Sequence, residues 1–186
     1  MTTRLLDVAG ALVFDLPGGE DKRGRGVELF REDRVTEALG RNFVPVQTSL
    51  LHNNEGTLRG LHLAAGLRQG KLITGVAGQI WDVLFDFRPG SPTRGLYAGV
   101  ELSGAHPESI YCPPGVAHGF VSLASNSIVT LTVDVLFSGV PEYAIEAFDS
   151  ELGIPWPVPE SACVRSDRDM SAPAFRHAGV VGIQAE

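Results

Sequence analysis

The sequence lacks the features that mark membrane, secreted and nucleic-acid-binding proteins. No apolar run approaches the roughly 20 residues needed to cross a bilayer. The amino-terminal stretch MTTRLLDVAG has no long apolar core of a secretory signal. The formal net charge is −7, and no stripe of lysine and arginine offsets it, so extended contact with a nucleic acid backbone is not expected. We therefore expect a soluble, cytoplasmic protein that binds neither membrane nor nucleic acid, while a small anionic ligand is compatible with these features.

Cysteine is also scarce. The chain has two, Cys112 and Cys163, which are too few for a disulfide framework and do not have the short spacing of a metal-binding pair. We expect both to be reduced structural thiols without a chemical role.

Glycine and proline are plentiful, with 22 and 12 residues, and they divide the chain into short segments rich in Val, Ile, Leu, Phe and Thr. This pattern favours an all-β domain. The length of 186 residues fits one domain over 1–186 with an irregular carboxyl-terminal arm from about 157. The clearest strands are 43–51, 79–88 and 127–137, and in the second Trp81, Val83, Phe85 and Phe87 would share one face. Further strands are expected at 8–14, 27–31, 57–63, 71–77, 95–102, 109–112, 117–123 and 142–147, with a helix at 32–39 and a short helix around 161–170.

A histidine and a lysine lie in neighbouring expected strands. Strand alternation puts His62 on one face with Gly60, and Arg59 on the other face with Leu61, unless Gly60 marks a bulge. Taken alone, a strand histidine is more often a packed or surface residue than a catalytic base. Lys71 opens the next strand and could reach the same cavity if the strands form a barrel.

Other polar residues are ambiguous when taken singly. Asp82 and Asp86 share a face of an otherwise apolar strand and need partners, for which a salt bridge is the simpler explanation. His118 follows a rigid Pro-Pro-Gly turn and has no assignable role by itself. The basic segment 21–28 suits either a phosphate or a solvated loop.

Together, seven strings resemble the dTDP-4-dehydrorhamnose 3,5-epimerase family from about Asp21 to Asp169. In chain order they are the RG-containing loop ending at Glu28, the segment 47–62 ending in RGLH, QGKL at 69–72, DVLFDFR at 82–88, SPT at 91–93, PPGVAHGF at 113–120 and LGIPWP at 152–157. The resemblance implies a cupin-type double-stranded β-helix, or jelly roll, with a few short helices. It also implies a metal-independent epimerase that acts on a 4-keto-6-deoxy sugar linked to a nucleotide, with dTDP as the expected nucleotide, in deoxysugar biosynthesis.

The resemblance assigns catalytic roles to three residues. His62 would be the base, Asp169 its orienting carboxylate, and Lys71 the group that stabilises the enolate. These residue types suit the chemistry, because a carbon beside a ketone is a weak acid whose deprotonation needs a neutral imidazole and a fixed positive charge at the developing oxyanion. An aspartate behind the imidazole holds its tautomer and stabilises the imidazolium.

The expected partner is a nucleotide-diphosphate 4-keto sugar, and no cofactor is expected. Its contacts would fall on Arg23, Glu28, Gln47, Arg59 and His118, with the two arginines as natural diphosphate partners. No metal is expected either, since metal-binding cupins carry an HxH unit whereas His62 is followed by Leu-Ala. Similar proteins are homodimers whose sites borrow residues from the partner's amino-terminal strand, so we expect a homodimer.

The sequence departs from the family where its members carry a tyrosine that protonates the enolate. Leu131 stands at that position, and Leu136 and Phe137 stand at two later tyrosines; Gly26 and Ser49 replace a Phe and an Asn. We therefore expect inversion of one carbon, C3 or C5, with another proton donor, for which Tyr111 and Tyr143 are outside candidates. The alternatives are a keto-sugar isomerase and a non-catalytic sugar-nucleotide-binding cupin.

Overall fold

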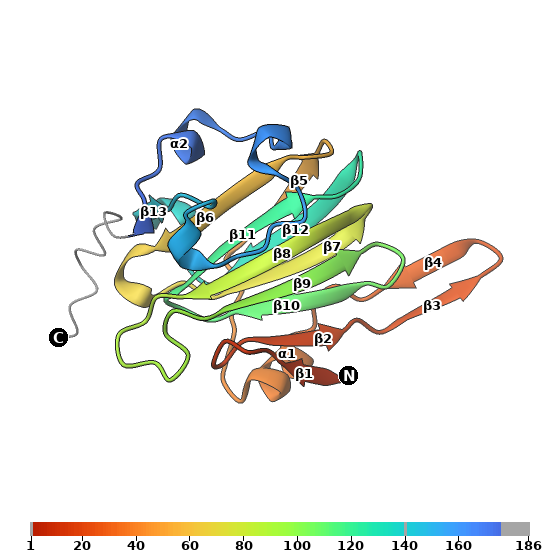
Figure 1. Ribbon diagram of the computed structural model, residues 1–186. Helices are drawn as coiled ribbons and strands as arrows, with labels where there is room; N and C mark the ends of the chain where they lie inside the picture. Colours follow the sequence, from red (N-terminus) through yellow and green to blue (C-terminus); the bar gives the residue numbers. More distant parts are fainter. Residues whose placement is uncertain (1, 140, 176–186) are drawn as a thin grey trace.

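The computed structural model describes residues 2–139 and 141–175 and is built mainly from antiparallel strands (Figure 1). The strands are β1 (Thr3–Leu5), β2 (Leu12–Asp15), β3 (Gly18–Asp21), β4 (Gly24–Val27), β5 (Gln47–Asn53), β6 (Leu58–Ala64), β7 (Lys71–Ala77), β8 (Gln79–Asp86), β9 (Tyr97–Ser103), β10 (Glu108–Cys112), β11 (Val116–Ser122), β12 (Ser127–Val133) and β13 (Glu142–Ala144). The helices are α1 (Glu32–Leu39) and α2 (Asp167–Met170), with single 3₁₀ turns at Ala65–Leu67, Phe137–Gly139, Ser150–Leu152 and Glu160–Ala162.

Two sheets pack face to face as a jelly roll, as the family resemblance implies. The six-stranded sheet has the order β1-β2-β10-β7-β12-β5 and the five-stranded sheet the order β13-β6-β11-β8-β9. Apolar side chains from both sheets fill the space between them, for example Ile73 and Val129 from the first and Ile80 and Leu84 from the second. Burial of such side chains contributes about 1.5–3 kcal/mol each.

Two segments cover the outer faces of the sheets. Helix α1 packs through Val35 on one side of the six-stranded sheet, in a cluster that includes Phe43 and Tyr111. The carboxyl-terminal segment, residues 145–175, covers the five-stranded sheet (Figure 1). There, Val83, Phe85 and Phe87 pack together on that outer face, with Trp81 against the cluster, so the expected shared face of this strand is confirmed.

Several expected boundaries were wrong. The expected strand at 27–31 is β4, which ends at Val27, and the strand at 43–51 begins at Gln47 because Phe43 is buried beneath α1 instead of pairing. The strand at 127–137 ends at Val133, since Asp134 leaves the ladder and accepts a hydrogen bond from the amide of Gly70 at 2.6 Å. The short helix expected around 161–170 is a 3₁₀ turn followed by α2.

The β3–β4 hairpin pairs only with itself and extends away from the two sheets (Figure 1). Its strands are almost wholly exposed. No helix among the described residues is long and apolar enough to span a membrane.

Candidate active site

A cavity of about 410 Å³ opens between the two sheets and is closed on one side by the carboxyl-terminal segment. Both sheets and this segment contribute to its wall. The lining residues are Ser49, Leu51, Thr57, Leu58, Arg59, His62, Lys71, His118, Phe120, Leu131, Phe137, Glu142, Val164, Arg165, Ser166, Arg168 and Asp169. The sequence indicates three candidate catalytic residues and five candidate ligand contacts. Five of these eight residues line this one cavity.

His62 and Asp169 form a hydrogen-bonded pair at the edge of this cavity. His62 Nε2 lies 2.7 Å from Asp169 Oδ1, and the amide of Gly60 donates to Asp169 Oδ2 at 3.4 Å. Burial alone would raise the pKa of Asp169, but the hydrogen bond and charge of His62 outweigh it and hold the pKa below its ordinary value. An ionised Asp169 fixes the proton on Nε2 and leaves His62 Nδ1 as the nitrogen that can accept one.

The short helix α2 presents Asp169 to the histidine. Its Ser166 cap accepts a hydrogen bond from the Asp169 amide at 3.2 Å, and Asp169 is only 4% exposed. The carboxylate therefore comes from a segment that crosses over the sheet, 107 residues from its partner in sequence.

A bulge at Gly60 brings Arg59 to the same side of β6 as His62. The pairing of β6 with β11 shifts register between His118 and Phe120. Gly60 has φ +105°, and a Cβ there would lie 2.6 Å from the His118 carbonyl oxygen, so only glycine fits. Regular alternation would have placed Arg59 opposite to His62, and the bulge is the exception foreseen for Gly60.

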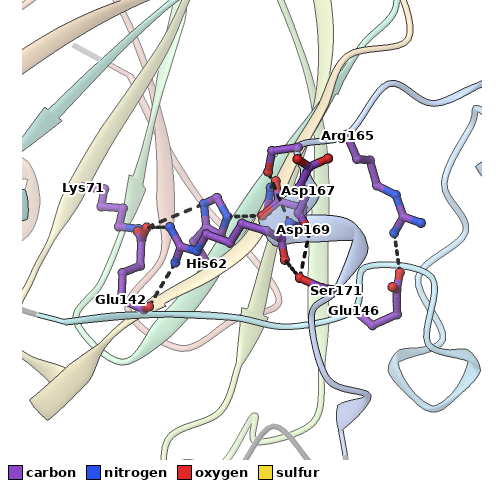
Figure 2. A network of polar contacts seen from close by, with 11 residues as sticks. His62, Lys71, Glu142, Glu146, Arg165, Asp167, Asp169 and Ser171 are labelled. Carbon is purple, nitrogen blue, oxygen red and sulfur yellow. Dashed lines mark hydrogen bonds and ion pairs between the residues drawn. The ribbon is translucent and has the colours of Figure 1, made fainter.

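Lys71 reaches the cavity from the six-stranded sheet and meets a carboxylate that the sequence analysis missed. Its Nζ lies 3.4 Å from Glu142 Oε1, while Glu142 Oε2 lies 3.8 Å from His62 Nδ1 and 3.1 Å from a guanidinium nitrogen of Arg168 (Figure 2). Burial opposes the charged form of Glu142, but Lys71, His62 and Arg168 together hold its pKa below the ordinary value. A charged residue at the start of the strand expected at 142–147 was the signal that could have revealed it.

His118 is a buried member of the wall, 5% exposed. Its Nε2 lies 2.7 Å from Asp82 Oδ2, so the partner expected for Asp82 is found. Asp82 Oδ1 has no hydrogen-bond partner among the described residues. Asp86 has a different partner, Arg88, and lies away from the cavity.

Arg59 is held in place by an amide. Its Nε donates to Asn53 Oδ1 at 2.8 Å, and the Asn53 amide nitrogen donates to the carbonyl oxygens of Leu51 and Ser127, both at 3.1 Å. Among the described residues, neither terminal nitrogen of Arg59 has a hydrogen-bond partner, so both can form a fork toward an anion. Arg165 and Arg168, which the sequence analysis did not single out, add further positive charge to the cavity wall.

The other three candidate contacts lie outside the cavity wall. Gln47 is next to it, because its side chain accepts a hydrogen bond from the amide of Phe137 at 3.3 Å. Arg23 lies on the β3–β4 hairpin, where it pairs with Asp21 at 2.6 Å. Glu28 follows the hairpin and lies 3.4 Å from Arg34.

None of the three tyrosines of the chain lines the cavity. Tyr111 packs with Phe43 beneath α1, where burial raises the pKa of its phenol to about 12. Tyr143 pairs with Leu63, so its side chain faces away from His62, and Tyr97 lies beside the outer cluster of the five-stranded sheet. Leu131 and Phe137 present carbon to the cavity instead.

No group of three or more His, Cys, Asp or Glu side chains that could hold a metal ion occurs within residues 2–139 and 141–175. Within these described residues, the cavity wall carries two imidazole–carboxylate pairs, one lysine, one further carboxylate and three arginines. These groups can bind an anion and move protons.

A jelly roll with a histidine–aspartate pair and a lysine in the cavity between its sheets defines a cupin-type enzyme of proton transfer. The model of the dTDP-4-dehydrorhamnose 3,5-epimerase family matches residues 5–177. The chain belongs to this family. The family resemblance stated from sequence is thus confirmed.

Relatives match over nearly the whole chain. The dTDP-4-dehydrorhamnose 3,5-epimerase of Mycobacterium tuberculosis is 34% identical over 185 residues, which are 98% of this chain and 92% of that protein. The solved structure of an epimerase from the same organism has a TM-score of 0.92 over 98% of this chain and 92% of that chain, with 34% identity.

Two ligand complexes are also similar. A Legionella pneumophila 3,5-epimerase solved with dTDP-4-keto-L-rhamnose has a TM-score of 0.86 and 31% identity, and covers 95% of this chain and 94% of that one. A 3'-monoepimerase from Streptomyces bikiniensis with dTDP-quinovose has a TM-score of 0.85 and 29% identity, and covers 95% and 89%.

Proposed function

We propose that this protein epimerises a dTDP-linked 4-keto-6-deoxy sugar at a single carbon, C3 or C5. The observation that carries the proposal is the His62–Asp169 pair at 2.7 Å, which faces Lys71 across a cavity walled by arginines. A similar protein binds dTDP-4-keto-L-rhamnose and another is a monoepimerase, which supports both the substrate class and the single inversion.

The geometry suits proton abstraction beside a ketone. His62 Nδ1 takes the proton, Asp169 stabilises the imidazolium, and the Lys71 ammonium meets the negative charge that develops on the ketone oxygen. Arg59 binds the diphosphate through the nitrogens that Asn53 leaves free. His118, held by Asp82, contacts the sugar from the floor of the cavity. Because only protons move, the proposal includes no cofactor and no metal.

Nuclear magnetic resonance in heavy water tests this proposal. The protein is incubated with dTDP-4-keto-6-deoxyglucose, and the C3 and C5 proton signals are followed with time. We expect loss of one signal together with inversion at that carbon, and no loss with His62→Ala. Loss of both signals with inversion at both carbons would mean a double epimerase, and a ketone that changes position would indicate an isomerase. Binding of the sugar nucleotide without exchange at either carbon would indicate a non-catalytic sugar-nucleotide-binding cupin.

We also propose a homodimer in which the β3–β4 hairpin of one subunit reaches the cavity of the other. The hairpin carries Arg23 and leads to Glu28, both exposed and outside the cavity of their own chain. Light scattering should give twice the chain mass, and Arg23→Ala should weaken dTDP binding without changing that mass. A monomer that binds dTDP normally would contradict this arrangement.

A further inference from the structure

Inversion of a carbon needs a proton donor on the face opposite to the base. We propose that Lys71 is this donor and delivers the second proton to the enolate. The inference rests on the proposed epimerase function and gives Lys71 a second task besides stabilising the enolate oxygen.

The two sheets place His62 and Lys71 on opposite sides of the cavity. His62 projects from β6 of the five-stranded sheet and Lys71 from β7 of the six-stranded sheet. In the pairing of β7 with β12, Lys71 lies opposite Val133 and Ile73 lies opposite Leu131. Lys71 and Leu131 therefore share the inner face of that sheet as diagonal neighbours. A planar enolate lying between the sheets would have the imidazole on one face and the ammonium on the other.

The other polar groups in the cavity wall do not meet both requirements. Glu142 and His118 belong to the five-stranded sheet, like His62, and would approach from the same side. The arginines retain their protons throughout the accessible pH range. On the six-stranded sheet, Leu51 and Leu131 have hydrocarbon side chains without an acidic proton, and Ser49 has a hydroxyl that is a much weaker acid than an ammonium. Among the described lining residues, Lys71 alone combines the required side with a proton that can be released.

The proton balance closes without a further reactant. The C–H bond breaks, its proton goes to His62 Nδ1, and its electron pair enters the enolate. An N–H bond of Lys71 then breaks as a new C–H bond forms on the opposite face, which leaves a neutral amine and an imidazolium. Glu142 lies between the two nitrogens, 3.8 Å from His62 Nδ1 and 3.4 Å from Lys71 Nζ, and can return the proton from one to the other (Figure 2).

Lys71→Arg separates the two tasks of the lysine. The guanidinium keeps the positive charge but does not give up a proton. His62 can still remove a proton, exchange it with solvent and return deuterium to the same face. We expect wash-out of the substrate proton into heavy water within about 10-fold of the natural protein, while formation of the inverted sugar falls by about 10² or more, the usual contribution of general acid catalysis.

Two further variants keep the test decisive if arginine does not fit. Lys71→Gln should slow both wash-out and inversion, with inversion slowed more. Leu131→Tyr added to either variant should restore inversion, because it places a phenol beside the lost ammonium on the same sheet face. Thermal unfolding and dTDP binding report whether each variant is folded.

Two outcomes would overturn the role of Lys71. If Lys71→Arg inverts the sugar at the natural rate, water or another group is the proton donor. If the variant loses wash-out and inversion equally, Lys71 only stabilises the enolate oxygen. The absence of wash-out with the natural protein would instead refute the proposed function, and the role of Lys71 with it.

Discussion

Replacement of Asp169 by Asn tests the central pair of the site. The substitution keeps the shape of the side chain and removes the charge that faces His62 Nε2 at 2.7 Å. A hydrogen bond to a charged group contributes about 1.5–3 kcal/mol. If this contribution is made only when the imidazolium forms, its loss slows proton abstraction by roughly 10- to 150-fold, because about 1.4 kcal/mol corresponds to a factor of ten.

The assay is the initial rate of wash-out, the loss of the C3 or C5 proton of the keto sugar to heavy water, measured at saturating substrate by nuclear magnetic resonance. Asp167→Asn is the matched control, because Asp167 lies two residues earlier on α2, is exposed and does not line the cavity. We expect the control to exchange normally. An Asp169→Asn rate within a factor of two of the natural rate would refute the reasoning that Asp169 stabilises the imidazolium.

Three further predictions concern residues with distinct tasks. Asp86→Ala should lower the free energy of unfolding in urea by about 3 kcal/mol, because it leaves Arg88 without its buried partner at 2.8 Å, while wash-out by the folded protein stays normal. Tyr111→Phe should leave wash-out unchanged and the free energy of unfolding equal or up to roughly 1 kcal/mol higher, because the buried phenol has no hydrogen-bond partner in the described part of the chain. Asn53→Leu should raise the dissociation constant for dTDP about 10-fold through loss of the contact that orients Arg59, and an unchanged constant in calorimetry would contradict that role.

The local sequence pattern predicted elements whose burial follows a simple period. The strand at 71–77 and the helix at 32–39 have the boundaries that were expected. Strands β1 and β3 could not be found in this way, because they are short, exposed and without apolar alternation. Element type followed the period of the apolar residues, whereas strand ends depended on tertiary contacts such as the burial of Phe43.

The contacts within the site depend on tertiary structure in the same way. No periodic pattern connects His62 with Asp169, and only the family resemblance paired them before the structure brought them to 2.7 Å. Glu142 was overlooked because its partners, Lys71 and Arg168, come from distant segments of the chain. The orientation of Arg59 depended on a register shift at Gly60, which sequence could suggest but not decide.

The histidine–aspartate pair also couples the site to the acid stability of the fold. Because the folded-state pKa of Asp169 lies below its ordinary value, its ionisation stabilises the folded protein at pH values above the ordinary aspartate pKa, and this contribution is lost as the pH falls through the folded-state pKa. Asp169→Asn has no ionisable carboxyl at this position and therefore lacks this pH-dependent contribution. Its free energy of unfolding should fall less steeply than that of the natural protein between about pH 5 and pH 3. Urea denaturation at each pH measures the two slopes, with Asp167→Asn expected to follow the natural protein. Parallel curves for the natural protein and Asp169→Asn would mean that the pKa of this carboxyl is the same in the folded and unfolded states, and that the contact with His62 does not stabilise its ionised form.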